Sequence, residues 1–234
     1  MLVILPRMKT WGPEIWEEKS KHHDDVGVIL GTGFNTKSLE KNTQRTLSVL
    51  DALGFTKDLP RDATILDVGV GPSARFSLEL AKRGYRLTGI DGSEEALKRA
   101  REKSGGKVQL IQGDIFSFTT PETFDALFCV ETFFHLPAHL SLSAFQSFHR
   151  ALKPKGRALV QFAVLNEMTP TYLFKQLTYM SAYKLLKPIR TALGKQSFYV
   201  TVARHSDQEI RDIAERTGFR VLNADDGYYL FEKV

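Results

Sequence analysis

The stretch ILDVGVGPSARF places two glycines where an apolar run gives way to a helical pattern. Gly69, Gly71 and Ala74 satisfy the spacing G-x-G-x-x-G/A. With this spacing a chain turns sharply from a strand into a helix, and its backbone can approach a bound nucleotide closely. A tight turn without a ligand is the alternative. The strand–helix frame around the glycines favours a cofactor site.

Acidic residues stand at the carboxyl ends of four successive apolar runs. They are Asp67, Asp91, Asp114 and Glu131. The carboxyl ends of parallel strands meet at one edge of a sheet, where open α/β sheets bind their ligands. Four carboxylates at one edge repel each other unless a cation or hydrogen-bond donors stabilise them. The pattern therefore indicates a ligand site rather than four unrelated turn residues.

Strands and helices that position these residues alternate from Ala63 onward, which predicts a doubly wound parallel sheet. The expected strands are residues 63–68, 85–91, 108–114, 124–131 and 157–165. The expected helices are residues 73–84, 93–106 and 140–156. Ser93 is a suitable N-cap for the second helix, and Pro154 and Gly156 are expected to end the third.

The two ends of the chain add further elements. SLEKNTQRTLSVLDALGF predicts a helix that ends at Gly54, whereas GVILGTGFN, with Gly31 and Gly33, is interpreted as a loop. Ser206 and Glu209 form a capping-box pattern at the start of a helix. FRVLNAD and YYLFEKV then predict two strands that form a hairpin.

These features resemble the class I S-adenosylmethionine-dependent methyltransferases, whose first motif is an acidic residue followed by x-G-x-G. Asp67, Gly69 and Gly71 stand in those positions. The resemblance extends over residues 63–165 and returns in the last helix and hairpin. It implies an α/β fold with a seven-stranded, mostly parallel sheet and a C-terminal antiparallel hairpin. One departure is Pro72–Ser73, where the family commonly has glycine or another small residue.

Charge distinguishes two cofactors that the glycine spacing allows. A dinucleotide places a negative pyrophosphate at such a turn, where bare N–H groups receive it. Asp67, two residues before Gly69, would repel that pyrophosphate. S-adenosylmethionine instead carries an ammonium and a sulfonium, which an acidic neighbour stabilises. The residues therefore favour S-adenosylmethionine over NAD(P).

The resemblance also implies which residues contact S-adenosyl-L-methionine and its product S-adenosyl-L-homocysteine. In the family, the acid after the second strand binds both ribose hydroxyls. The acid after the third strand meets the adenine amino group, and the next residue packs on the ring. The implied contacts in this chain are Asp67, Gly69, Gly71, Asp91, Gly92, Asp114 and Ile115.

Methyl transfer from a sulfonium is an in-line displacement in which the protein mainly supplies alignment, so a general base is optional. Glu131 and His135 are the candidate catalytic residues, because either can accept a proton from a hydroxyl or an amine. A packing role for His135 is an equal alternative. We expect Phe133 and Phe134 in the core and Cys129 as a buried structural thiol.

The acceptor is a small molecule in our first interpretation. The stretch Glu131-Thr132-Phe133-Phe134 lacks the [ND]-P-P-[YFW] pattern of enzymes that methylate exocyclic amines of bases. The basic, aromatic region 167–204 is expected to cover the acceptor. An RNA surface and a membrane-surface helix are alternatives for that region. An NAD(P)-dependent oxidoreductase and a non-catalytic cofactor-binding module also stay open.

We expect a single methyltransferase domain over residues 1–234. Its parts are a helical N-terminal cover (1–60), a cofactor-binding core (61–166), a variable substrate lid (167–205) and a C-terminal helix with hairpin (206–234). Trp11 and Trp16 are expected to close over the cofactor from the N-terminal side.

Composition excludes several other classes. One cysteine among 234 residues excludes an intramolecular disulfide and a cysteine-cluster metal site. His22 and His23 are interpreted as surface residues, so no metal site is expected. No run approaches the ~20 apolar residues of a membrane span, and we expect a cytoplasmic protein. The net charge of +5 is interpreted as a solvated basic surface, and the residues do not indicate an oligomeric state.

Overall fold

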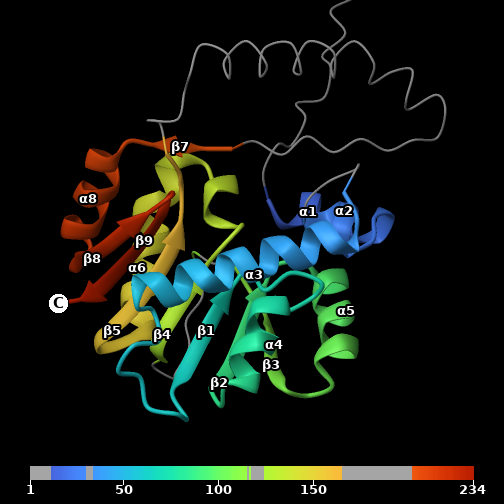
Figure 1. Ribbon diagram of the computed structural model, residues 1–234. Helices are drawn as coiled ribbons and strands as arrows, with labels where there is room; N and C mark the ends of the chain where they lie inside the picture. The colour runs from blue at the N-terminus through green and yellow to red at the C-terminus, as the bar shows by residue number, and fades with distance from the viewer. Residues whose placement is uncertain (1–11, 30–33, 115, 117–123, 165–201) are drawn as a thin grey trace, which may run out of the picture.

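A seven-stranded sheet forms the centre of the computed structural model (Figure 1), which describes residues 12–29, 34–114, 116, 124–164 and 202–234. The strands follow the order β3-β2-β1-β4-β5-β9-β8. Strand β9 runs antiparallel to both of its neighbours, β5 and β8. The bounds are β1 (Thr64–Val68), β2 (Arg86–Asp91), β3 (Val108–Gln112), β4 (Phe124–Cys129), β5 (Leu152–Gln161), β8 (Phe219–Asp225) and β9 (Tyr228–Lys233). The predicted fold class and the C-terminal hairpin are confirmed.

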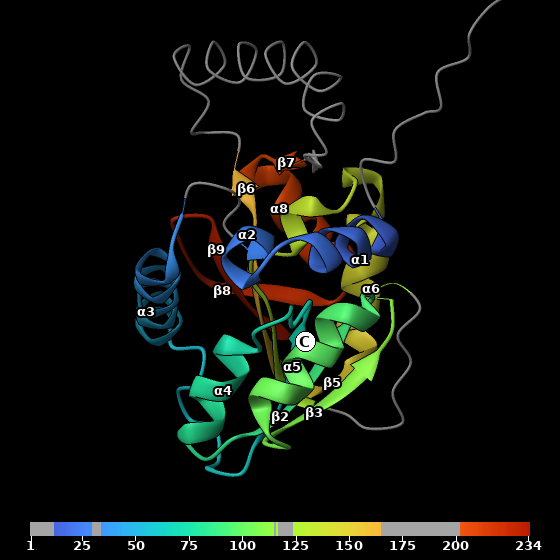
Figure 2. The same ribbon diagram turned by 90° about the vertical axis from the view of Figure 1, so that its right-hand side faces the viewer.

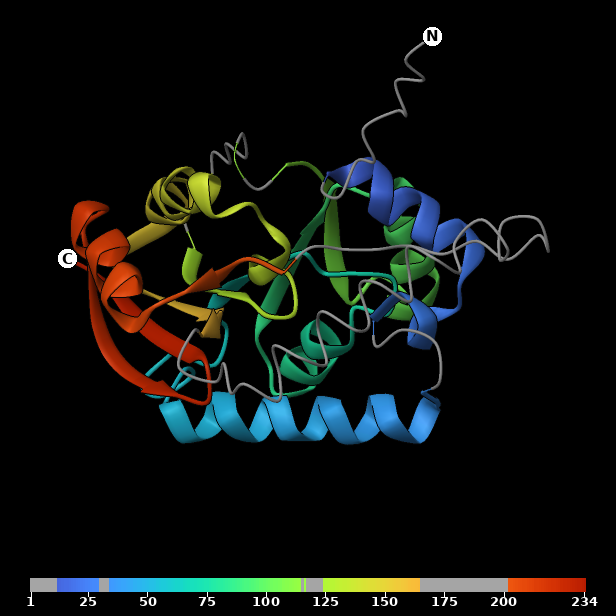
Figure 3. The ribbon, with the colours of Figure 1, turned by 90° about the horizontal axis from the view of Figure 1, so that it is seen from above.

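Helices cover both faces of the sheet, as Figure 3 shows from above. One face packs against α3 (Thr36–Leu53) and α4 (Arg75–Lys82). The other face packs against α6 (Ser141–Ala151) and α8 (Asp207–Arg216). Helix α5 (Glu94–Ser104) contacts β2 and β3, and α1 (Pro13–His22) lies against α5 (Figure 2). Short elements complete the description: α2 (Asp25–Ile29), η1 (Phe133–His135), η2 (Ala138–Leu140), β6 (Ala163–Val164) and β7 (Arg204–His205).

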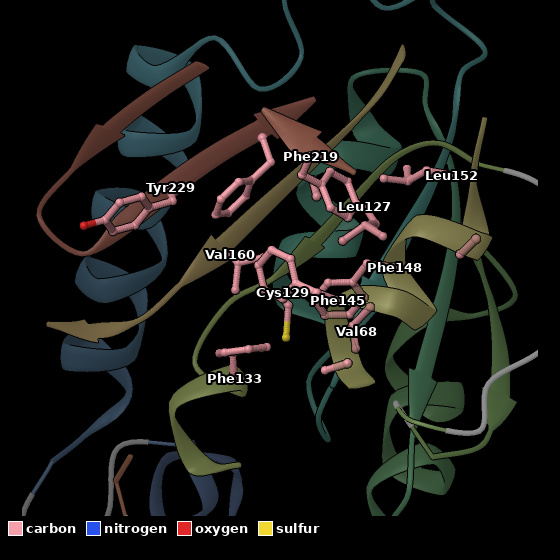
Figure 4. Packing of buried hydrophobic residues seen from close by; sticks show 14 of the residues in the cluster. Val68, Leu127, Cys129, Phe133, Phe145, Phe148, Leu152, Val160, Phe219 and Tyr229 are labelled. Atoms are coloured by element: carbon pink, nitrogen blue, oxygen red, sulfur yellow. The ribbon is translucent and has the colours of Figure 1, made fainter. Parts of the chain in front are cut away.

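Phenylalanine side chains dominate the core on the α6 side. Phe133 and Phe145 are fully buried and meet edge to face, with ring centroids 5.6 Å apart. Figure 4 shows both rings close to Cys129, whose thiol is fully buried. A fully buried side chain of this size contributes about 1.5–3 kcal/mol through removal from water. The expectations of a core Phe133 and a buried structural Cys129 are therefore confirmed, whereas Phe134 is only half-buried.

Local signals in the sequence account for three of the helix ends. Ser93 caps α5 by accepting a hydrogen bond from the Ala96 N–H at 3.1 Å. Ser206 and Glu209 form the predicted capping box of α8. Gly54 ends α3 in the left-handed region, with φ of 77°. Each of these contacts satisfies a backbone group that the helix itself leaves without a partner.

Two expectations about helix boundaries were wrong. Helix α6 ends at Ala151, and the residues from Leu152 onward belong to β5. Proline restricts the preceding residue to an extended conformation, so Pro154 ends the helix early rather than sitting inside its last turn. The stretch GVILGTGFN is not wholly a loop, since Gly27 to Ile29 lie in α2. The carboxylate of Asp24 caps that turn by accepting from the Gly27 N–H at 2.7 Å.

Three expectations fall on residues outside the described part of the chain. They concern Trp11, Ile115 and nearly all of the substrate lid at 167–205. They stay predictions.

Candidate active site

A pocket lies at the carboxyl ends of β1, β2, β3 and β4. Its floor is formed by the glycine turn after β1 and by the turns that follow the next three strands. Its opposite wall comes from α1 and α2, through residues such as Pro13, Trp16 and Val28. The topology brings these segments together because parallel strands place all their carboxyl ends at the same edge.

The glycine turn needs its glycines for two different reasons. Gly69 has φ of +80°, and a Cβ there would lie 2.2 Å from Thr132 Oγ1. Gly71 has φ of +63°, but a Cβ there would meet no heavy atom within 4 Å. Gly69 is thus required by packing between β1 and the chain after β4. Gly71 instead leaves its backbone open to the pocket.

Asp91 joins the glycine turn to the start of α5. Its Oδ2 accepts from the Gly71 N–H at 2.9 Å, and its Oδ1 accepts from the Ser93 N–H at 2.9 Å. Burial raises the pKa of the Asp91 carboxyl, and the N–H groups of Ser93, Gly71 and Gly92 oppose that rise. The carboxylate lines the pocket with its orientation fixed from two sides.

Asp114 follows β3 and also lines the pocket. Its Oδ1 accepts from the Phe116 N–H at 2.8 Å, which fixes the turn after the strand. Gly92 lines the same pocket, and a Cβ at Gly92 would lie 3.0 Å from Pro13 Cβ. The close approach of α1 to this edge therefore depends on the absence of a side chain at Gly92.

Asp67 lies behind the pocket wall rather than in it. It is 3 % exposed, and it is not among the residues that line the pocket. Its Oδ2 accepts from Ser77 Oγ of α4 at 2.7 Å. Burial raises its pKa to about 7, helped by the nearby charge of Asp91 and opposed by the Ser77 hydroxyl. Thus three of the four acids meet at the pocket, and a direct cofactor contact of Asp67 stays a prediction.

Glu131 is held by an ion pair. Its Oε2 binds Arg75 Nη2, and its backbone N–H donates to Gln161 Oε1 at 2.9 Å. The other terminal nitrogen of Arg75 donates to Asn42 Oδ1 at 2.7 Å and to Thr43 Oγ1 at 2.6 Å, both in α3. Arg75 and Glu131 both line the pocket.

His135 lies at the end of η1 and lines the pocket beside Leu136. Its ring centroid is 5.0 Å from that of Trp16 in α1 and 4.5 Å from that of Phe134. Its backbone N–H donates to the Thr132 carbonyl at 3.0 Å. The imidazole is thus placed between the chain after β4 and the N-terminal helix.

Residues 65–156 match a family model described as a methyltransferase domain. The resemblance to the class I S-adenosylmethionine-dependent methyltransferases is thus confirmed over these residues, which carry a methyltransferase domain. No helix in the described ranges is long and apolar enough to cross a membrane.

Curated relatives of this chain include the ubiquinone biosynthesis O-methyltransferase of Vibrio cholerae serotype O1, 34% identical over 128 residues. That match covers 53% of this chain and 49% of the relative. The enzyme of the same name from Colwellia psychrerythraea is 35% identical over 131 residues, covering 54% of this chain and 50% of the relative. The chain therefore spans about half the length of the curated relatives it matches.

Solved structures share the fold over nearly the whole chain. Magnesium protoporphyrin IX methyltransferase from Synechocystis PCC 6803, solved with bound S-adenosylmethionine, gives a TM-score of 0.65 at 17% identity, covering 95% of each chain. An amino pentose methyltransferase from Micromonospora echinaspora gives 0.60 at 15% identity, covering 91% of this chain and 100% of that one. At these identities the likeness is one of fold.

The pocket at the strand ends fits a cationic, nucleoside-containing cofactor. The described residues that line it include three acids, Asp91, Asp114 and Glu131, but only one arginine or lysine, Arg75. The open space at Gly71 leaves room for a ligand against the backbone. Ser20 also lines the pocket, and its buried Oγ has no hydrogen-bond partner in the described part of the chain. A polar ligand atom would offset the cost of that unpaired hydroxyl, about 1–3 kcal/mol. The described residues include no group of three or more metal-ligating side chains.

The sequence alone did not reveal several residues of this pocket. Arg75 follows the glycine motif, but its acidic partner lies 56 positions later. Thr132 stands in the stretch after the fourth strand without a signal of its own, although its side chain packs against Gly69. Ser20 carried no signal in the sequence, because its backbone contact with α5 spans 79 positions. The same holds for Glu17, which does not itself line the pocket but contacts α5 78 positions away.

Proposed function

We propose that this chain transfers a methyl group from S-adenosyl-L-methionine to an oxygen or nitrogen atom of a small-molecule acceptor. The observation that carries the proposal is one continuous pocket that contains both Asp91 and His135. Asp91 is suited to hold a nucleoside, and His135 is suited to receive a proton. In-line transfer requires the donor and the acceptor to share one cavity in fixed alignment.

The cofactor is proposed to lie along the strand ends. Asp91 would accept hydrogen bonds from the ribose hydroxyls, and Asp114 would accept one from the adenine amino group. Gly69 and Gly71 would let the methionine part approach the backbone. This placement is supported by the fixed orientation of the Asp91 carboxylate, which two backbone N–H groups hold. The cofactor supplies an electrophilic methyl group on a sulfonium sulfur.

The acceptor is proposed to bind beside His135. His135 would accept the proton of the acceptor hydroxyl or amine that receives the methyl group. Glu131 is the weaker candidate because its carboxylate binds Arg75 and would lose that partner on protonation. The walls near His135 include Trp16 and Leu136, which suit a flat, partly apolar acceptor.

Oxygen is the first choice for the methylated atom, since the curated relatives are named O-methyltransferases. A phenolic hydroxyl on a small aromatic acceptor suits both His135 and the apolar walls. The basic, aromatic region expected to cover the acceptor lies outside the described residues. An RNA acceptor is therefore treated as an outcome of the test rather than as a second proposal.

The test measures transfer of a labelled methyl group to a panel of phenols, amines and RNA. The proposal expects transfer to at least one small molecule. It also expects His135→Gln to lower kcat by about 10²–10⁴-fold, the range for loss of a general base. Glu131→Gln is the matched variant, and we expect it to retain more activity than His135→Gln. Transfer to RNA alone would overturn the small-molecule assignment.

A further inference from the structure

Helix α1 forms part of the pocket wall but lies outside the methyltransferase sheet. Pro13, Trp16 and Ser20, which lie along one side of the helix, all line the pocket. Figure 2 shows α1 lying above α5, across the end of the domain where the strands finish. Something must hold a helix of this kind in place, because it shares no backbone ladder with the sheet.

Glu17 provides the first attachment. Its Oε2 accepts from Ser93 Oγ at 2.8 Å and from the Glu95 N–H at 3.0 Å. Both donors belong to the N-terminus of α5, where backbone N–H groups lack partners within the helix. A carboxylate is favoured at that position by the positive end of the helix dipole. Glu17 therefore caps α5 from a different helix.

The same turn holds the proposed ribose contact. The Ser93 N–H donates to Asp91 Oδ1, while the Ser93 hydroxyl donates to Glu17. A single residue thus bonds both to the pocket carboxylate and to the carboxylate that holds α1. Movement of α1 away from α5 would break the hydrogen bond between the Ser93 hydroxyl and Glu17 and leave only the bond from the Ser93 N–H to Asp91.

Arg99 provides a second attachment farther along α5. Its Nη1 donates to the Ser20 carbonyl at 2.8 Å and to the His23 carbonyl at 2.9 Å, and its Nη2 binds Asp25. These bonds hold the C-terminal end of α1 and the start of α2. Glu17 therefore attaches the part of α1 that carries Trp16 to α5, and Arg99 attaches the C-terminal part.

Trp16 makes the contact on the catalytic side. Its ring lies 5.0 Å from the ring of His135, and Lys19 Nζ lies 4.9 Å from the Trp16 ring centroid. The Lys19 ammonium also donates to the Val28 carbonyl at 2.7 Å, which ties α1 to α2. The indole is therefore held between a cation of its own helix and the imidazole after β4.

We propose that Glu17 is a positioning residue: by binding the N-terminus of α5 it holds α1 over the pocket and keeps Trp16 against His135. The inference rests on the proposed function for the roles of the cofactor and His135. It goes further in assigning a role to a residue that contacts neither the cofactor nor the acceptor. Release of Glu17 would open the pocket beside Asp91 and remove one wall from the imidazole.

The test compares Glu17→Gln with Glu18→Gln in the full chain. Glu18 is the matched control because it neighbours Glu17, its side chain is 51% exposed, and its ion pairs, with Lys21 and His22, lie within α1. Calorimetric titration with S-adenosylhomocysteine should give roughly tenfold weaker binding for Glu17→Gln, the order expected for loss of a charge-assisted bond. Glu18→Gln should stay within about twofold of the parent.

A fluorescence readout separates positioning from general loss of structure. The chain has two tryptophans, so in a Trp11→Phe background the emission reports Trp16 alone. Glu17→Gln should shift that emission to longer wavelength, as for an indole that enters water, with the thermal unfolding temperature of the sheet domain nearly unchanged. Glu17→Asp keeps the charge but shortens the reach, and it should give an intermediate shift if Glu17→Gln fails to fold.

Equal emission and equal S-adenosylhomocysteine affinity in the Glu17→Gln and Glu18→Gln proteins would overturn the inference. Failure of the parent protein to bind S-adenosylhomocysteine would instead overturn the proposed function. The emission of Trp16 would still report in that case whether Glu17 holds α1, so the two failures are distinguishable.

Discussion

Arg75 and Glu131 form an ion pair in the wall of the pocket, although 56 positions separate them in the sequence. Arg75 begins α4, directly after the glycine turn, and Glu131 follows the end of β4. The pair therefore ties the loop that is proposed to hold the methionine part of the cofactor to the segment that leads to His135. Hydrogen bonds from Arg75 to Asn42 and Thr43 extend the connection to α3.

Disruption of this ion pair should destabilise the domain. The Arg75 and Glu131 side chains are only 11% and 20% exposed. Arg75→Ala would leave a partly buried carboxylate unpaired, at a cost of up to about 3 kcal/mol. Urea unfolding of both single alanine variants and of the double variant measures the coupling. We expect a coupling above about 1 kcal/mol, and simple additivity would contradict the assignment.

The two motif glycines should respond differently to alanine. Gly69→Ala would push a methyl group onto Thr132, whose Oγ1 lies 2.2 Å from the position that a Cβ would take, so the free energy of unfolding should fall by several kcal/mol. Gly71→Ala meets no neighbour, so its cost should be limited to about 1 kcal/mol from the positive φ. The Gly71 methyl would instead occupy ligand space, so affinity for S-adenosylhomocysteine should fall in a folded protein. Equal loss of stability in both variants would argue against this division.

Asp67 should make the stability of the ligand-free protein depend on pH. Burial raises its pKa from 3.8 to about 7, so between these pH values the folded state holds a proton that the unfolded state has released. The contribution of Asp67 to stability is therefore lost as pH rises through this window, by up to about 1.4 kcal/mol per pH unit. The Asp67→Asn variant has no titrating carboxyl at this position, so its stability does not fall in this way. Its amide oxygen can still accept the hydrogen bond from the Ser77 hydroxyl.

Urea unfolding at pH 5 and pH 8 checks the prediction. The stability of Asp67→Asn relative to the parent should be higher at pH 8 than at pH 5. The subtraction cancels groups that titrate in both proteins. If the difference between the two proteins is the same at both pH values, Asp67 titrates near its ordinary pKa in the folded state.

The fold was accessible from sequence because its signals are local. Apolar runs that alternate with capped helices need no long-range information, and Ser93, Gly54 and the Ser206–Glu209 box each act within a few residues. Position along a strand also sufficed to bring Asp91 and Asp114 to the pocket, because all parallel strands end at one edge.

Contacts between distant segments were not accessible in the same way. Asp67 occupies the expected strand, but its side chain turns to Ser77 beneath the glycine turn, which depends on how α4 packs. In the sequence Glu17 is one of several acids in a charged helix. Only the packing of α1 on α5 distinguishes it from Glu18, because Glu17 binds Ser93 whereas Glu18 pairs with Lys21 of its own helix. Such roles arise from packing geometry rather than from residue type or spacing.

The most direct test of the proposed cofactor site is calorimetric titration of the parent protein with S-adenosylhomocysteine, with NADH in parallel. We predict saturable binding of S-adenosylhomocysteine alone. We also predict that Asp91→Ala weakens this binding by about 1.5–3 kcal/mol for each charge-assisted bond lost, whereas Asp62→Ala, whose side chain is 82% exposed, does not. Binding of NADH alone, or affinity unchanged by Asp91→Ala in a folded protein, would contradict the cofactor assignment.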